Sequence, residues 1–254
     1  MSVLEDFEDD GVKYLELRTT PRKCGEISKN EYVSLILDCI DELGRESMSA
    51  YLLLSVDRAN TTTEAMEVVD LAIEFRDRGV VGIDLCGNPL KGDISIYREA
   101  FSKAKEHGLK LALHFAEVPA SSSVEELQTL LSFKPERLGH VINVPDSIKE
   151  EIIKRKLGLE LCLTCNVNAK MISGGFAEHH FKDWQGKGCP LILCTDDVGI
   201  FCSSLSNEYL LAAEHFGLCR QDLLRLCGEG IDCIFGGEED KRRLRMALME
   251  FETL

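Results

Sequence analysis

Histidines and carboxylates occur directly after several apolar segments of this 254-residue chain. One segment ends in His114 and is followed by Glu117, another ends in His140, and a third leads to the pair Asp196 and Asp197. Imidazole and carboxylate groups suit Zn²⁺ and similar divalent ions. Such an ion lowers the pKa of a bound water to about 7, and Glu117 can serve beside it as a general acid. The pattern therefore predicts a metal site that supplies hydroxide at neutral pH.

Each of these residues also has a purely structural interpretation. A single histidine at a strand end is often a satisfied core residue, and an aspartate pair after a strand commonly caps the next helix. Gly87, which follows another apolar segment, can be a simple turn glycine. The coincidence of these residues at successive strand ends favours a functional site, but both interpretations remain open from the sequence.

The elements that must position these residues alternate along the chain. Seven apolar segments are predicted strands: residues 12–17, 51–56, 80–85, 109–114, 137–142, 159–163 and 191–195. Most are followed by segments with helical periodicity, at residues 28–44, 63–78, 94–108, 123–133 and 145–156. Strands that alternate with helices form parallel βαβ units, and nearly continuous apolar strands indicate a sheet covered on both faces or closed into a barrel. In a barrel, the C-terminal strand ends form one rim, where active sites lie.

The strand count and the first turn select between two parallel folds. A doubly wound sheet is expected to carry glycines for phosphate after its first strand, and Arg18 to Arg22 do not match that motif. We therefore predict an α/β fold, a (β/α)8 barrel that lacks its first strand, since seven strands are counted and the chain opens with a helix-like segment at residues 2–9. Residues 1–254 are expected to form a single domain with a helical tail at about residues 205–254.

Composition limits the partners and the compartment. Charged residues make up 29% and apolar residues 44% of the chain, as in globular proteins. No apolar run approaches the ~20 residues of a membrane span, and the N-terminus has no basic region typical of a secretory signal. The net charge of −15 argues against nucleic acid, although one buried arginine can still bind a small anion. We expect a cytoplasmic monomer that binds a small molecule, without membrane or nucleic-acid partners.

The 11 cysteines are expected to be free thiols in a reducing compartment. Cys162 and Cys165 form a single CxxC motif, whereas a zinc ribbon needs two. We therefore expect these two cysteines to pack as small hydrophobic residues on a strand.

Six segments resemble the adenosine/AMP deaminase family, in the family's order: residues 14–22, 82–87, 113–117, 137–140, 161–166 and 194–197. The loop 19–22 and residues 205–209 are most similar to the adenosine deaminase-like branch, the N6-methyl-AMP deaminases. The resemblance implies a zinc-dependent TIM barrel of the metal-dependent hydrolase type, with one zinc ion per chain. It also implies hydrolytic deamination of a 6-aminopurine nucleotide, with N6-methyl-AMP converted to IMP and methylamine.

The resemblance assigns roles residue by residue. His114 and Asp196 match zinc ligands, Glu117 matches the proton donor to purine N1, and His140 matches the histidine that orients and activates the water. The positions matching substrate contacts are Thr19, Thr20, Pro21, Arg22, Asp57, Gly87 and Asp197. Arg22 is the attractive phosphate partner, because a guanidinium fork fits phosphate bidentately.

Three positions depart from the family pattern. No His-x-His pair, which supplies two zinc ligands in the family, occurs in the 254 residues. Val141 stands where a glycine is usual, and Cys165 replaces a usual serine. Two alternatives stay open: adenosine itself as the substrate, or a non-catalytic truncated form that binds a nucleotide or a partner. From the missing pair, we expect this chain alone to bind zinc weakly, show little deaminase activity and be less soluble than a form carrying the pair.

Overall fold

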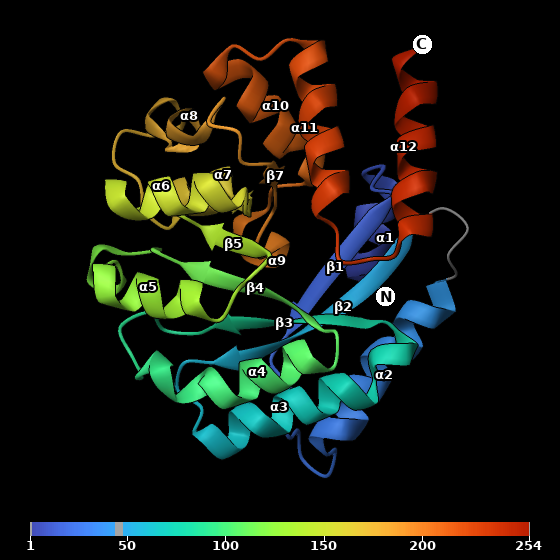
Figure 1. Cartoon of the computed structure of the whole chain (residues 1–254). Coiled ribbons are helices and arrows are strands. Elements are labelled where there is room, and N and C mark those ends of the chain that lie inside the picture. Colours follow the sequence, from blue (N-terminus) through green and yellow to red (C-terminus); the bar gives the residue numbers. More distant parts are fainter. Residues whose placement is uncertain (1, 44–47, 254) are drawn as a thin grey trace. The chain divides into compact units, whose positions relative to one another are not determined.

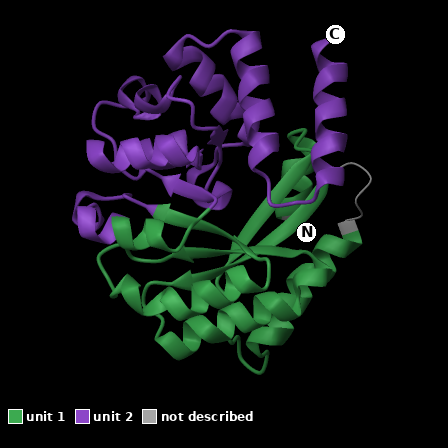
Figure 2. Cartoon of the chain, viewed as in Figure 1, with its two compact units in different colours: residues 1–114, 128–135 green, residues 115–127, 136–254 purple. Residues whose placement is uncertain are grey.

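The computed structural model describes residues 2–43 and 48–253 of the chain, in which seven strands alternate with helices (Figure 1). The chain is divided into two compact units (Figure 2). Unit 1 comprises residues 1–114 and 128–135, and unit 2 comprises residues 115–127 and 136–254. The boundary follows His114, so that residue and Glu117 belong to different units.

Unit 1 holds parallel strands that pair in chain order. These strands are β1 (Tyr14–Thr19), β2 (Ser49–Asp57), β3 (Val80–Cys86) and β4 (Lys110–Phe115), whose last residue belongs to unit 2. The helices are α1 (Ser2–Asp9), α2 (Lys29–Leu43), α3 (Thr62–Glu74) and α4 (Arg98–Glu106), with short 3-10 helices at Arg76–Arg78 and Ile94–Tyr97. Helix α3 packs against β2, β3 and α4 (Figure 1).

Local sequence explains these elements of unit 1. The consecutive residues Leu52, Leu53 and Leu54 of β2 are at most 1% exposed, which is typical of a strand covered on both faces. Helix α3 begins at Thr62 because Thr61 and Glu64 form a capping box. The Thr61 hydroxyl accepts a hydrogen bond from the Glu64 backbone N–H, and the Glu64 carboxylate accepts one from the Thr61 backbone N–H.

Unit 2 holds three parallel strands and most of the helices. The strands β5 (Arg137–His140), β6 (Gly158–Leu161) and β7 (Leu191–Leu193) pair in chain order. Its helices are α6 (Asp146–Arg155), α7 (Leu163–Asn168), α8 (Phe181–Trp184), α9 (Val198–Phe201), α10 (Leu205–Phe216), α11 (Arg220–Cys233) and α12 (Glu238–Glu252), with 3-10 helices at Pro119–Ser121 and Phe176–Glu178. Helix α5 (Val124–Ser132) is divided between the units. Helix α11 packs against β7 and α12.

The predicted alternation of strands and helices is confirmed, but the strands predicted at 12–17, 137–142, 159–163 and 191–195 end at Thr19, His140, Leu161 and Leu193. The strand predicted at 137–142 ends at His140, because His140 and Val141 have φ angles of 63° and 47°, which extended strands cannot contain. The strand predicted at 159–163 ends at Leu161, and the chain turns into α7 as the Asn166 N–H donates to the Cys162 carbonyl at 3.0 Å. The end predicted for the first amphipathic helix, Gly44, lies outside the described residues.

The placement of the CxxC motif on a strand was wrong. Cys162 precedes α7 and Cys165 lies within it, where both are buried. All 11 cysteines are free thiols, as expected. Across the helices in the described part of the chain, none combines the length and apolar character that crossing a membrane requires.

Candidate active site

Unit 1 contains a buried carboxylate that organises three side chains around the ends of its strands. Asp84, on β3, is fully buried, and its Oδ1 lies 3.0 Å from His114 Nδ1 and 3.6 Å from a guanidinium nitrogen of Arg18. The hydroxyl of Ser55 donates to Oδ2 at 3.0 Å. Burial raises the pKa of Asp84, but the charges of His114 and Arg18 and the hydrogen bonds from His114 and Ser55 bring this pKa below its usual value.

The Asp84–His114 pair fits a zinc ligand. A metal-binding histidine usually donates its second ring N–H to a carboxylate, which fixes the ring and its tautomer. With Nδ1 of His114 donating to Asp84, Nε2 is the ring nitrogen that can bind a metal. Asp84 was not among the predicted site residues, although an acidic residue inside an apolar strand is a signal that it has a fixed partner.

If His114 binds a divalent metal as predicted, we expect Asp84→Asn to weaken the binding of added Zn²⁺ about 10- to 100-fold, the usual effect of losing the partner of a ligand histidine. Competition between the chain and a chromophoric chelator would measure this change. Asp77→Asn is the matched control, because the Asp77 side chain is 87% exposed. Equal zinc affinity in Asp84→Asn and the unmodified chain would remove Asp84 from the metal site.

Two predicted substrate residues of unit 1 are fitted against each other. Gly87 has a φ of +97°, and a Cβ at this position would lie 2.7 Å from the Asp57 carboxylate. That carboxylate accepts a hydrogen bond from the Ala59 N–H at 2.7 Å. Gly87 therefore has a backbone conformation that favours glycine, and its lack of a side chain also makes room for Asp57.

We expect Gly87→Ala to lower the free energy of unfolding by about 1–2 kcal/mol and to displace Asp57. Gly11→Ala isolates the backbone effect, because Gly11 has a φ of +86° and a Cβ added there would meet no atom of the described residues within 4 Å. Chemical denaturation should show a similar loss in both variants, whereas calorimetry with the kind of purine nucleotide that the resemblance implies should show weaker binding only in Gly87→Ala. Equal nucleotide affinity in the two variants would argue against a binding role for Asp57.

The loop after β1 places the other predicted substrate residues. The Thr19 hydroxyl lies 2.8 Å from the Tyr32 hydroxyl, Thr20 contacts the Cys86 thiol at 3.6 Å, and Pro21 is buried. The exposed Arg22 guanidinium lies over the Tyr32 ring, 5.6 Å from its centroid. This cation–π contact holds Arg22 without using its hydrogen-bond donors.

Unit 2 contains the predicted proton donor. Glu117 follows the end of β4 and is half-buried. Its backbone is fixed by Asn143, whose side-chain N–H donates to the carbonyls of Ala116 and Glu117 at 3.5 and 3.3 Å. The Asn143 backbone N–H also donates to the Ala116 carbonyl at 2.9 Å. The main chain at Glu117 is thus held on a fixed path within unit 2.

Unit 2 also brings His140 close to the predicted ligand Asp196. His140 Nε2 lies 4.0 Å from Asp196 Oδ2, and the Cys165 thiol donates to the same oxygen at 2.9 Å. Burial and the Asp196 carboxylate raise the pKa of the Cys165 thiol, so it keeps the proton that it donates. Candidate ligand atoms of His140, Cys162 and Asp196 lie within 4.8 Å of one another, which is the spacing of a metal site.

The second aspartate of the pair has a structural role. The Asp197 carboxylate accepts a hydrogen bond from the Ile200 N–H at 3.1 Å and caps α9. The interpretation of this residue as an N-cap is therefore confirmed, while its contact with substrate stays a prediction. His114 and Asp196, the two predicted zinc ligands, belong to different units.

Two buried side chains next to His140 were not among the predicted site residues. Asn166 and His179 are both fully buried, and each is hydrogen-bonded to the other. Only the adjacent histidines His179 and His180, in the segment before α8, pointed to this region.

A parallel α/β fold with histidine and carboxylate groups after its strands defines a class of protein, the barrel hydrolases that use a metal. The family model for adenosine deaminase matches residues 1–251. An N6-mAMP deaminase of Arabidopsis thaliana is 41% identical, over 96% of this chain and 74% of that protein. An N6-methyl-AMP deaminase of Danio rerio is 40% identical, over 99% of this chain and 75% of its own length.

A solved structure extends the likeness to three dimensions. The crystal structure of Arabidopsis ADAL complexed with IMP matches with a TM-score of 0.92 and 40% identity, covering 98% of this chain and 75% of that one. The chain belongs to the adenosine deaminase family, a family of aminohydrolases, and has its TIM-barrel fold.

Proposed function

We propose that this chain hydrolytically deaminates a 6-aminopurine nucleotide, with N6-methyl-AMP as the preferred substrate and IMP and methylamine as products. The observation that carries the proposal is the Asp84–His114 hydrogen bond, which leaves Nε2 of His114 able to bind a metal. The proposal is also supported by the 41% identity of this chain to an N6-mAMP deaminase. The deaminase chemistry of the family supports a metal cofactor, which we propose to be one zinc ion per chain.

Each predicted site residue has a proposed role in this reaction. His114 and Asp196 would hold the zinc ion, which when bound supplies an activated water at neutral pH. Glu117 would carry a proton to N1 of the purine, so that the ring accepts the added oxygen at C6. His140 would orient that oxygen, and the backbone of Gly87 and the side chains of Asp57 and Asp197 would hold the purine nucleotide.

The 5′-phosphate is proposed to bind at Arg22. Among the contacts of the described residues, Arg22 has the cation–π contact with Tyr32 and no carboxylate partner. A guanidinium held by its face keeps its donor fork for a phosphate. This residue distinguishes a nucleotide from a nucleoside, because only the nucleotide carries the phosphate.

We expect Arg22→Ala to raise KM for N6-methyl-AMP about 10- to 100-fold, the cost of losing hydrogen bonds to a charged group. KM for N6-methyladenosine should change little, since that nucleoside lacks the phosphate. Arg242→Ala is the matched control, because the Arg242 side chain is 74% exposed on α12. An equal loss for nucleotide and nucleoside would rule out the phosphate role of Arg22.

The proposal is tested by giving the zinc-supplied chain N6-methyl-AMP, AMP or adenosine and measuring the purine product and the released amine. The expected products are IMP and methylamine from N6-methyl-AMP, IMP and ammonia from AMP, and inosine and ammonia from adenosine. The largest kcat/KM is expected for N6-methyl-AMP, and a preference for adenosine would establish the nucleoside alternative instead. The sequence also favours a second candidate, nucleotide binding without turnover, because the 254 residues contain no His-x-His pair. Tight IMP binding without any product would support that candidate.

We also propose that the protein acts in the cytoplasm, which the 11 free thiols support, because thiols stay reduced there. Its monomeric state, the absence of nucleic-acid partners and the single domain with a helical tail stay predictions. Light scattering during size-exclusion chromatography would test the first of them.

A further inference from the structure

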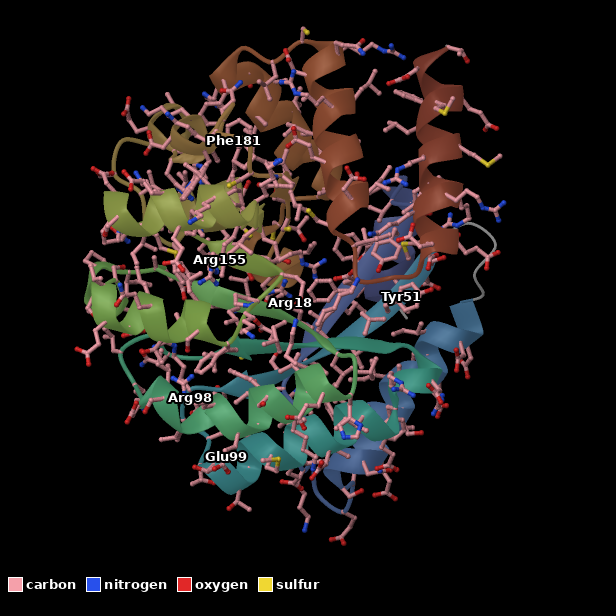
Figure 3. The ribbon with its side chains drawn as sticks, viewed as in Figure 1. Arg18, Tyr51, Arg98, Glu99, Arg155 and Phe181 are labelled. Carbon is pink, nitrogen blue, oxygen red and sulfur yellow. The ribbon has the colours of Figure 1, made fainter. Side chains whose placement is uncertain are left out.

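A continuous chain of hydrogen bonds runs through the buried part of unit 2 and ends at His140. The backbone N–H of Phe181, at the start of α8 (Figure 3), donates to His179 Nδ1 at 3.0 Å. His179 Nε2 lies 3.1 Å from Asn166 Oδ1, and Asn166 Nδ2 lies 3.1 Å from His140 Nδ1. His140 Nε2 in turn lies 4.0 Å from Asp196 Oδ2.

The backbone N–H of Phe181, at one end of this series of hydrogen bonds, determines which atom donates in each of the three hydrogen bonds. A backbone N–H can only donate, so Nδ1 of His179 must be an acceptor without a proton. A neutral His179 then carries its proton on Nε2 and donates it to an oxygen of Asn166. The amide nitrogen of Asn166 therefore faces His140, and because an amide N–H₂ only donates, Nδ1 of His140 is an acceptor as well.

The opposite arrangement does not satisfy the same contacts. If the Asn166 amide were turned over, its nitrogen would face Nε2 of His179, which would have to give up its proton. The proton of His179 would then sit on Nδ1, against the Phe181 N–H at 3.0 Å. Two donors would face each other in a fully buried place, where an unmatched polar group costs about 1–3 kcal/mol.

Burial keeps His179 neutral, as this arrangement requires. His179 is fully buried, and this burial, followed by the nearby His180 and His140, lowers its pKa to about 3. Asn166 is fully buried too, on the short helix α7. The main chain of His140 is held separately, because His180 Nε2 donates to the His140 carbonyl at 2.6 Å.

We propose that Asn166, oriented by His179, is a positioning residue that holds His140 as the tautomer with its proton on Nε2. His140 then presents a hydrogen-bond donor, rather than a general base, on the side where Asp196 lies. Its part in turnover is to hold an oxygen atom by donating a hydrogen bond. The role in turnover rests on the proposed function, whereas the tautomer is a property of the folded chain alone.

The tautomer is measured directly by two-bond ¹H–¹⁵N correlation spectra of the imidazole rings in the ¹⁵N-labelled chain, without zinc or substrate. Spectra of His140→Gln and His179→Gln assign the two rings. We expect both rings of the unmodified chain to be Nε2–H tautomers. An Nδ1–H tautomer at His140, or a mixture of both forms, would overturn the proposal without any further variant.

Substitution of the central residue should reverse the tautomer. A carboxylate can only accept, so in Asn166→Asp the His140 ring should move its proton to Nδ1. Asn168→Asp is the matched control, since Asn168 is exposed on the same helix, and it should leave the spectrum of His140 unchanged. His179→Leu offers no donor to Asn166, so the single orientation of the Asn166 amide should be lost and the Nδ1–H form should appear at His140. An unchanged Nε2–H form in this variant would contradict the role of His179.

Turnover separates this inference from the proposed function. With N6-methyl-AMP as the substrate, Asn166→Asp should lower kcat about 10- to 100-fold with little change in KM, as when the outer partner of a site residue is lost. If His140 and His179 are Nε2–H tautomers but the chain makes no IMP, the inferred tautomer is supported and the proposed function is refuted. Product formation by a chain with an Nδ1–H ring at His140 would refute the inference alone.

Discussion

In a form of the chain that also carries the His-x-His pair, Glu117→Gln is expected to lower kcat for N6-methyl-AMP by about 10²- to 10⁴-fold, the usual contribution of a positioned general acid. Glutamine has nearly the shape of glutamate and can still donate a hydrogen bond, but it cannot deliver a proton to the purine ring. The main chain at this position is fixed by Asn143, so the substitution should change the chemistry rather than the path of the chain. IMP should therefore bind the variant with nearly unchanged affinity.

Stopped-flow measurements of product formation and calorimetry with IMP would separate these two effects. Glu125→Gln is the matched control, because Glu125 is exposed on α5, and its kcat should stay that of the unmodified chain. A variant at Glu117 that turns over normally would remove this residue from the mechanism. A parallel loss of IMP affinity would instead indicate that Glu117 holds the ligand.

Acidification is expected to destabilise the chain below pH 6.5 through two buried histidines of unit 2. Burial is the largest cause that lowers the pKa of His179 to about 3 and that of His180 to about 4, from an ordinary value of 6.5. At pH values between these lowered pKa values and 6.5, the two histidines bind protons in the unfolded chain but not in the folded chain. The free energy of unfolding therefore falls as the pH falls. Each histidine contributes about 1.4 kcal/mol per pH unit, or roughly 4 kcal/mol for both at pH 5.

Denaturant titrations at a series of pH values would measure this slope. His179→Gln should remove about half of the histidine contribution, because glutamine keeps a donor for Asn166 but does not take up a proton. His215→Gln is the matched control for the loss of an imidazole, since His215 is only half-buried and stacks on Phe176. A free energy of unfolding that stays constant between pH 6.5 and pH 5 would contradict the prediction.

The alternation of strands and helices was predictable because apolar periodicity follows from burial, as Leu52 to Leu54 of β2 illustrate. The strand ends were less predictable. The left-handed φ of His140 and Val141 ends β5 early, and neither residue type signals such a conformation. Hydrogen bonds within unit 2 hold that backbone, from the Val141 N–H to the Phe115 carbonyl and from Trp184 to the Val141 carbonyl.

The candidate site was predictable where its residues follow strands directly, and this includes His114, Glu117, His140 and Asp196. Their supporting residues depend on tertiary contacts. Asp84 supports His114 from a neighbouring strand 30 residues away. The support of His140 by Asn166 depends on the turn into α7, where the sequence predicted a strand. The roles of the site residues in binding and turnover stay predictions.

The central claim, hydrolytic deamination of N6-methyl-AMP, is tested most directly by mass spectrometry of the reaction in oxygen-18-labelled water. A zinc-supplied form of the chain that also carries the His-x-His pair is predicted to release methylamine and IMP in equal amounts, with the heavy oxygen at C6 of the purine and with no product after a chelator is added. If that form binds N6-methyl-AMP but yields no labelled IMP, the proposed function is contradicted.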